Sequence, residues 1–258
     1  MLILLPPSES KAAPARRGRP VDVGTLSFPE LTATRERLLD ALVATSAAPD
    51  ALRRLFVGPS LADDVARNTR VRELPARPAL EVYTGVLYDA LDAATLSAAA
   101  RRRAASRLVV VSGLWGALRP TDRIPPYRLN ICSRLLGTPA LEPLWRGLLP
   151  TTLAAAAGSR GVVVDCRSTS YQAAGMPAGL GERTAVVRVL RESEGRRSVV
   201  SHAAKHTRGL VTRELLESGA DPRTPEALAE VLAARWPVEL TPPPLAGRPW
   251  TVSVVVTA

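Results

Sequence analysis

The chain has 258 residues, 46% of them apolar, and carries two cysteines and a formal charge of +10 at pH 7. No stretch approaches about 18 uninterrupted apolar residues, and two cysteines make no disulfide framework, so the composition excludes a membrane-spanning protein and a disulfide-stapled one. The apolar content suffices for a sizeable core, and we expect a single domain over residues 1–258. The basic charge favours phosphate-rich partners such as nucleic acid or nucleotides.

The first residues, MLILLPPSESK, contain an apolar run that is too short for a signal peptide and has no basic segment before it. We therefore expect a cytoplasmic protein without a membrane partner. We also expect a monomer that carries no cofactor.

Short apolar runs rich in β-branched residues predict strands, and longer stretches with helical apolar spacing predict helices between them. The expected strands lie at 2–5, 108–112, 161–166, 185–190, 198–202 and 251–256. The expected helices lie at 34–47, 91–106, 141–156, 203–218 and 224–235. Strands interleaved with helices indicate an α/β or mixed α+β fold, in which helices flank a mixed sheet.

Polar residues follow five apolar runs, counting LEV at 80–82 as a strand. In α/β sheets the carboxyl ends of parallel strands meet at one edge, where ligands bind, so we expect these residues to form one site. The alternative is that loops are simply polar everywhere. The candidates are Ser8 and Lys11, Tyr83 and Thr84, Gly113 and Gly116, Asp165, Arg167 and Ser168, and finally His202 and Lys205.

Only two of the 34 basic residues, Lys11 and Lys205, are lysines. Lysine offers an amine whose pKa can fall far enough for it to act as a base or nucleophile, which arginine cannot do. The alternatives are a phosphate contact without chemistry, or chance. We expect Lys11 to be a second ammonium that faces the same pocket as Lys205.

The segment SHAAKHTRG predicts a helix that starts near Ser201, with His202, Lys205 and Arg208 close together in its first turns. A basic cluster beside free helix amides suits a phosphate or carboxylate. His202 and His206 have the spacing of two metal ligands, but no further histidine exists to complete a metal site, and none is expected.

The stretch SGLWGALRPTDRIPPYRL, residues 112–129, combines a tight glycine turn with charge and a ring for stacking, from Arg119, Tyr127 and Arg128. It could hold a DNA backbone through its amides, as helix-hairpin-helix elements do, or form the wall of a small-molecule pocket. A pair of Asp165 with Arg167 is more often structural than catalytic.

Five segments together resemble the YaaA family, also called DUF328 or UPF0246, the peroxide stress proteins. They are MLILLPPSESK, VYTGVLYDAL, VSGLWGALRPTDRIPPYRL, DCRSTSY and SHAAKHTRGLVTRELL, in family order between residue 1 and about 217. Ser10 departs from the PPSEGK form of the opening, and the end of the chain departs from the longer polar tails of the family.

The resemblance implies a YaaA-type mixed α/β fold with a basic cleft and a helix-hairpin-helix-like element, here at Gly113–Pro120. It implies a role in limiting oxidative damage to DNA, through DNA binding and lowered reactive iron. The cleft would draw on residues carried over from the matching segments, namely Lys11, Tyr83, Thr84, Arg119, Tyr127, Arg128, Asp165, Arg167, Ser168, His202, Lys205 and Arg208.

Two hypotheses follow. In the first, the protein binds and shields DNA during peroxide stress, and any effect on iron is indirect because the sequence has no iron-ligand cluster. In the second, it is an enzyme for a nucleobase, a nucleotide or another small, phosphate-bearing anion, with Lys205 or Lys11 as base, acid or imine-forming amine. Tyr127, His202 and Asp165 would assist that amine.

Overall fold

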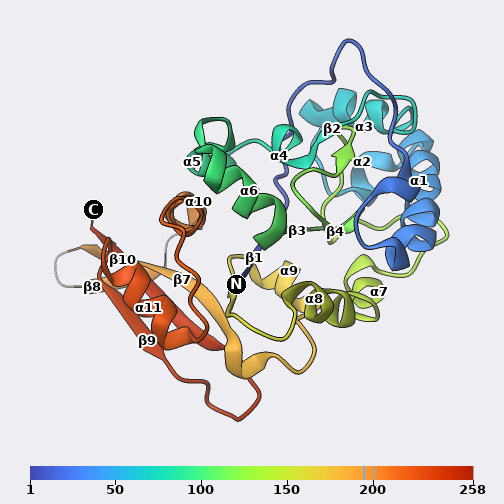
Figure 1. The fold of residues 1–258 in the computed structure, drawn as a ribbon. Coiled ribbons are helices and arrows are strands. Elements are labelled where there is room, and N and C mark those ends of the chain that lie inside the picture. Colours follow the sequence, from blue (N-terminus) through green and yellow to red (C-terminus); the bar gives the residue numbers. More distant parts are fainter. Residues whose placement is uncertain (194–195, 200, 258) are drawn as a thin grey trace.

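The computed structural model describes residues 1–193, 196–199 and 201–257, and the fold is a mixed α/β domain, as the sequence predicts (Figure 1). Within these residues, an eight-stranded sheet has the order β4-β3-β1-β6-β7-β10-β9, and β8 pairs with β7. The strands are β1 (Leu2–Leu5), β3 (Leu108–Ser112), β4 (Gly116–Leu118), β6 (Val163–Asp165), β7 (Thr184–Ser193), β8 (Arg196–Val199), β9 (Val238–Thr241) and β10 (Trp250–Thr257). A separate small sheet pairs β2 (Arg77–Pro78) with β5 (Arg123–Ile124).

The middle of the sheet is parallel, because β3, β1, β6, β7 and β10 all run in the same direction. Strands β4, β8 and β9 pair antiparallel with their neighbours. Every residue of β1 and β3 is buried, which explains why these strands read as continuous apolar runs rather than alternating ones. The carboxyl ends of β1, β3 and β6 therefore meet at one edge.

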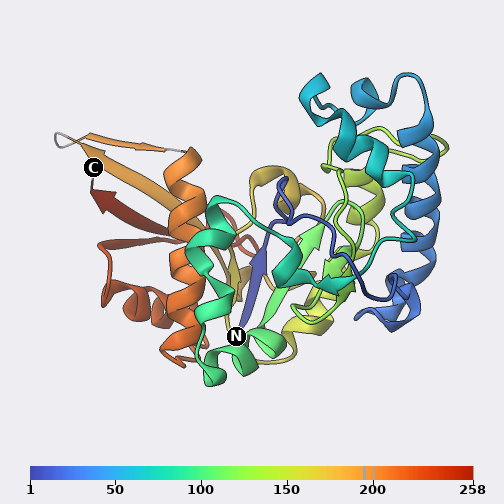
Figure 2. The ribbon, with the colours of Figure 1, turned by 90° about the horizontal axis from the view of Figure 1, so that it is seen from above.

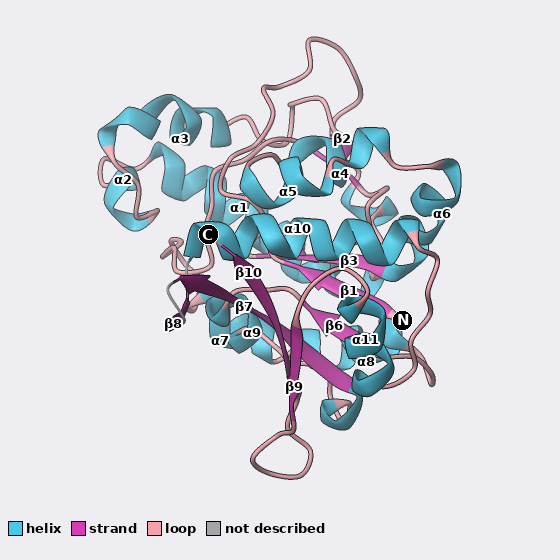
Figure 3. Cartoon of the chain, turned by 90° about the vertical axis from the view of Figure 1, so that its left-hand side faces the viewer, coloured by secondary structure: helices cyan, strands magenta, loops and turns pink. Residues whose placement is uncertain are grey.

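Helices cover both faces of this sheet (Figure 3). One face carries α5, α6 and α10, and α7, α8 and α9 lie on the other, while α1, α2 and α3 stack at the end beyond β4 (Figure 2). The helices are α1 (Thr32–Ala47), α2 (Ala51–Arg54), α3 (Ala62–Asn68), α4 (Ala79–Val82), α5 (Val86–Leu91), α6 (Ala98–Arg107), α7 (Leu141–Arg146), α8 (Leu149–Ala157), α9 (Thr169–Ala173), α10 (Ser201–Glu217) and α11 (Pro225–Ala233). No helix in the described part of the chain has the length and apolar character needed to cross a membrane.

Two expected helices differ from the structure for local reasons. The stretch 141–156 forms α7 and α8 instead of one helix, because Pro150 lacks an amide donor and fits only the first turn of a new helix. The stretch 91–106 is interrupted: α5 ends at Leu91, a short 3₁₀ turn spans Ala93–Thr95, and α6 begins at Ala98. The Ser97 side chain accepts a hydrogen bond from the amide of Ala100 and caps α6.

Two expected strands also differ. Residues 80–82, taken as a strand, belong to the short helix α4, and Tyr83 reaches the site through an isolated bridge to Lys11 instead. Residues 198–202 do not form a parallel strand: β8 returns antiparallel along β7 and ends at Val199, opposite Leu190. Strand β7 continues past the shared edge, since Asp165, the last residue of β6, pairs with Val186 near the start of β7. Strand β8 then returns along β7 toward that edge, and helix α10 therefore still begins near it.

Candidate functional site

A pocket of about 290 Å³ opens at the carboxyl edge of β1 and β6. Four parts of the chain line it: the loop after β1, the start of α5, the loop and helix after β6, and α10. We call it the sheet-edge pocket, and its lining is Pro6–Ser10, Gly85–Tyr88, Ser168, Tyr171, Lys205 and Arg208. Of the candidates from the sequence, the structure brings Ser8, Ser168, Lys205 and Arg208 together here.

Helix α10 supplies the positive charge of the pocket. Lys205 is exposed, whereas Arg208 is half-buried and donates hydrogen bonds from Nε and Nη2 to the carbonyl of Val187, at 3.2 and 3.0 Å. This anchor fixes the guanidinium at the sheet edge. His202 lies in the first turn of α10, but its side chain falls outside the described residues.

Lys11 lies immediately behind one wall of the sheet-edge pocket. Its Nζ donates to the carbonyl of Ser8 at 2.8 Å and stands 4.1 Å from the centroid of the Tyr127 ring and 5.6 Å from that of Tyr83. Burial is the main cause that lowers the pKa of this amine from 10.5 to about 7, and the nearby Arg128 lowers it further, against the opposing effect of Glu9. Lys11 is thus an amine that is partly neutral near physiological pH.

The tyrosines beneath Lys11 form a buried hydrogen-bonded chain with Ser112. The hydroxyls of Tyr83 and Tyr127 lie 3.0 Å apart, and that of Tyr127 lies 2.7 Å from Ser112 Oγ. Ser112 Oγ also accepts hydrogen bonds from the amides of Leu114 and Trp115. With both lone pairs used, its hydroxyl donates to the Tyr127 oxygen. Burial raises the pKa of Tyr83 to about 12 and holds that of Tyr127 well above its usual range, so neither becomes a counter-ion for Lys11.

The loop that separates Lys11 from the pocket is held from three sides. Tyr88 donates its hydroxyl to the carbonyl of Pro6 at 2.7 Å, and Arg128 Nη1 donates to the carbonyl of Glu9 at 2.9 Å. Gly85 takes a φ of +95°, and a side chain there would stand 3.2 Å from Ser8 Oγ. The loop therefore presents Ser8 to the pocket in a defined position, and Arg128 has a positioning role.

Asp165 and Arg167 form an ion pair with no exposed side-chain surface. Arg167 donates from Nε and Nη2 to the two carboxylate oxygens at 2.9 and 2.7 Å, and from Nη1 to the carbonyls of Tyr171 and Gly175. Both carboxylate oxygens of Asp165 are thus bonded to Arg167 and buried, an arrangement that favours the structural reading of this pair. The pair shapes the loop that carries Ser168 and Tyr171.

The stretch Gly113–Pro120 contains no helix, so the structure does not show the expected helix-hairpin-helix-like element there. It is the turn and second strand of the β3–β4 hairpin. The hairpin is buried and supported by Arg35, whose Nε and Nη2 donate to the carbonyls of Trp115 and Ala117. A side chain at Gly116 would collide with the Trp145 ring at 2.6 Å. The two glycines therefore serve packing, and their amides are not open to a DNA backbone.

Arg119 also lies away from the pocket. Its Nη1 donates to the carbonyls of Ser106 and Leu108, at the amino end of β3, opposite to the edge with the pocket. Thr84 lines a different cavity, beside α4, α5 and α6.

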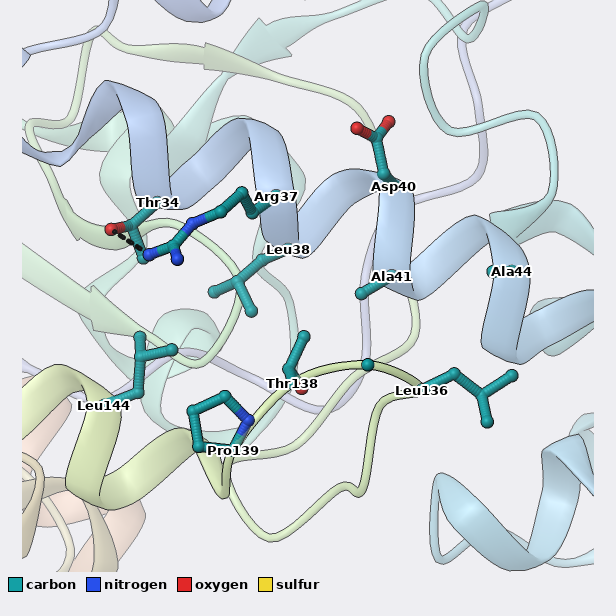
Figure 4. Close-up of a pocket in the computed structure, with 11 residues that line it drawn as sticks. Thr34, Arg37, Leu38, Asp40, Ala41, Ala44, Leu136, Thr138, Pro139 and Leu144 are labelled. Carbon is teal, nitrogen blue, oxygen red and sulfur yellow. Dashed lines mark hydrogen bonds between the residues drawn. The ribbon is translucent and has the colours of Figure 1, made fainter.

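A further hollow of about 390 Å³ lies between α1 and the loop at 136–139 (Figure 4). Leu38, Leu136, Pro139 and Leu144 give it an apolar lining, and Arg37 on its rim donates to Thr34 Oγ1. None of the candidate residues from the sequence lines it. The sheet-edge pocket is therefore the better candidate for chemistry.

Comparisons with known proteins identify the family. The family description "Peroxide stress protein YaaA" matches residues 1–239. The chain belongs to the YaaA family. It is 49% identical to a UPF0246 protein of Streptomyces coelicolor over 99% of this chain and 98% of that protein. It is 40% identical to a UPF0246 protein of Corynebacterium efficiens, over 99% of this chain and all of that protein. The resemblance seen in five segments is thus confirmed, and it extends beyond residue 217.

Within this YaaA-family chain, sequence reasoning missed Tyr88, Tyr171 and Ser112 as parts of the site. Tyr88 and Tyr171 line the pocket, and Ser112 ends the tyrosine chain. All three lie inside the quoted family segments, next to the residues that were chosen. Their polar aromatic or hydroxyl character was the available signal.

The lowered pKa of Lys11 can be measured directly, because the YaaA-family chain has only two lysines. After reductive ¹³C-dimethylation, NMR should show one lysine signal that titrates near pH 7, and the Lys11→Met variant should lack it. Between about pH 7 and 10.5 the folded state binds fewer protons at Lys11 than the unfolded state does. The free energy of unfolding should therefore rise with pH across this window, and it should rise more in the wild type than in Lys11→Met. Two lysine signals that both titrate above pH 9 would contradict the assignment.

Proposed function

We propose that this protein acts in the cytoplasm, in defence against peroxide stress, as a lysine-dependent enzyme for a small anionic ligand. The ligand class is a nucleobase, a nucleotide or another phosphate-bearing molecule. The sheet-edge pocket supports this class, because Lys205 and Arg208 line it together with Ser8 and Ser168, and its volume of about 290 Å³ suits a small ligand. The family description supports the link to peroxide stress.

Lys11 is the observation that carries the proposal. Its amine is half-buried over the Tyr127 ring, has a pKa of about 7, and contacts the carbonyl of Ser8, which lines the pocket. An amine near its pKa exists in both protonation states, so it can give or take a proton at physiological pH. In this proposal Lys205 and Arg208 hold the anion, and Lys11 reaches it when its bond to the Ser8 carbonyl opens.

The test is the exchange of each lysine for arginine, with peroxide survival of a rescued deletion strain as the readout. Arginine keeps the positive charge but does not lose its proton in proteins. Loss of rescue at Lys11 alone supports the enzyme, and full rescue by both variants contradicts it.

DNA binding is the second candidate, and the loop after β1 favours it. Arg16, Arg17 and Arg19 are exposed there, and no carboxylate in the described part of the chain lies within 4.0 Å of them. In this candidate function the three guanidiniums bind backbone phosphates of DNA, and the net charge of +10 adds to the attraction. Protection from iron-driven damage would then be indirect, and stoichiometric iron in the purified protein would contradict that.

If the loop binds DNA, affinity for a duplex should fall steeply with salt, and replacing Arg16, Arg17 and Arg19 by alanine should reduce the salt slope by about 2 to 3. The matched control replaces Arg53, Arg70 and Arg146, exposed arginines that each pair with a carboxylate. Fluorescence anisotropy of a labelled duplex across a salt series measures the affinity and the salt slope of the two triple variants. An equal loss in the two triple variants would show that only total charge matters and would exclude the loop as the site.

A further inference from the structure

A larger cavity, next to the sheet-edge pocket, lies between the α4–α5 segment, α6 and the turn at Pro120 and Thr121. Its volume of about 580 Å³ falls in the range of small-molecule binding sites. Helices α4, α5 and α6, in green at the centre of Figure 1, border it. We call it the α4–α6 cavity.

The wall of the α4–α6 cavity is apolar and aromatic. Leu80, Leu96 and Ala104 line it together with Tyr83 and Tyr88. The two tyrosine rings stack with centroids 5.3 Å apart, and only 2% and 6% of these residues is exposed. Such a surface favours an apolar body that can pack against a ring.

The mouth of the cavity carries negative charge although the chain as a whole is strongly basic. Three exposed carboxylates, Glu81, Asp89 and Asp92, line it with one guanidinium, that of Arg101. Asp92 also accepts the Thr95 hydroxyl at 2.6 Å and lies 3.9 Å from Arg213 Nη1, so three carboxylates stand against two guanidiniums. Arg101 turns its Nη1 to the carbonyl of Leu96 at 2.6 Å, and among the described residues no ion-pair partner lies within 4.0 Å of the Glu81 or Asp89 carboxylate. Charge complementarity therefore selects a cation at this mouth and disfavours an anion.

We propose that the α4–α6 cavity binds an organic cation: an ammonium group at Glu81, Asp89 and Asp92, joined to an apolar or aromatic body that enters the cavity. The apolar lining and the rings of Tyr83 and Tyr88 receive the body. The ligand class is thus opposite in charge to the anion proposed for the sheet-edge pocket, which this cavity adjoins at Tyr88.

The two tyrosines connect this cavity to Lys11. Tyr83 bonds through its hydroxyl to Tyr127, over which Lys11 stands, and Tyr88 bonds to Pro6 in the loop that covers Lys11. A ligand that contacts the rings from the α4–α6 cavity changes their packing, and with it the surroundings of the amine. Binding there is therefore expected to shift the titration of Lys11.

The experiment uses the full chain and two probes of matched chain length and opposite charge, 4-phenylbutylammonium and 4-phenylbutyrate. Amide chemical shifts are followed by NMR during titration with each probe. The ammonium should bind with a dissociation constant on the order of millimolar, as expected for about 11 heavy atoms. It should perturb the amides of residues 80–84, 89–96 and 101–105, which lie outside the sheet-edge pocket. The carboxylate should bind at least about tenfold more weakly.

Charge variants complete the test. Glu81→Gln with Asp92→Asn should weaken the ammonium probe about fivefold or more, and Arg101→Ala should strengthen it, because each changes the charge at the mouth. Lys205→Ala, which removes a charge from the sheet-edge pocket, should leave the affinity for the ammonium probe unchanged. Equal binding of the two probes, no binding of either, or shifts centred on the sheet-edge pocket would overturn the proposal.

Discussion

Replacement of Lys11 by arginine is expected to reduce peroxide survival of a rescued deletion strain to the level of the deletion itself. The reason is that arginine keeps its proton, whereas the pKa of Lys11 is lowered to about 7 by burial. Removal of a catalytic acid or base commonly costs about 10² to 10⁴ in rate, which is enough to abolish rescue. Survival counts after a peroxide pulse measure the effect.

Lys205→Arg is the matched control, because it changes the only other lysine of the chain at an exposed position of the same pocket. It keeps the positive charge that an anion needs, so rescue should persist. Lys11→Met removes both the charge and the amine while it fills a similar volume, so it should fail as Lys11→Arg does. Thermal unfolding of all three variants shows whether they fold. Full rescue by a folded Lys11→Arg protein would reduce Lys11 to a structural contact with the Ser8–Glu9 loop.

The two lysines illustrate what the sequence can predict and what it cannot. Their rarity singles both out, and the rule for strand ends places Ser8 and Ser168 at one pocket. Lys205 and Arg208 reach the same pocket from α10, which follows the antiparallel strand β8. The sequence does not distinguish an exposed Lys205 from a Lys11 that stands over a tyrosine ring. That difference depends on the bridge between Lys11 and Tyr83 and on the position of Tyr127, contacts between residues far apart in the chain.

The secondary-structure elements likewise include some that the sequence predicts and some that it does not. Strands β1, β3 and β6 are predictable because continuous buried runs leave a clear apolar signal. Helices α4 and α5 are too short to show helical periodicity, and Leu80–Val82 therefore read as a strand. The glycines of the β3–β4 hairpin were ambiguous, since a tight turn looks alike whether its amides face a ligand or, as here, a buried core.

Arg167→Met is expected to give the largest loss of stability among single substitutions at the candidate residues. It would leave the Asp165 carboxylate fully buried without its ion-pair partner, and breaking such a pair typically costs about 3 to 5 kcal/mol. For a domain of this size the midpoint of thermal unfolding should fall by roughly 6 to 20 °C. Loss of the bonds from Nη1 to the carbonyls of Tyr171 and Gly175 would also release the loop that carries Ser168.

Arg53→Met is the matched control, because Arg53 pairs with Asp50 at the surface, where its side chain is 81% exposed, and it should change unfolding free energy by less than about 1 kcal/mol. If Arg167→Met does not fold, Arg167→Lys still tests the pair, since it keeps the charge and loses the two-pronged contact with Asp165. The double variant Asp165→Leu/Arg167→Met should recover part of the stability, because no buried charge remains alone. A loss at Arg167 no larger than that at Arg53 would mean that the buried pair is not what fixes this edge of the sheet.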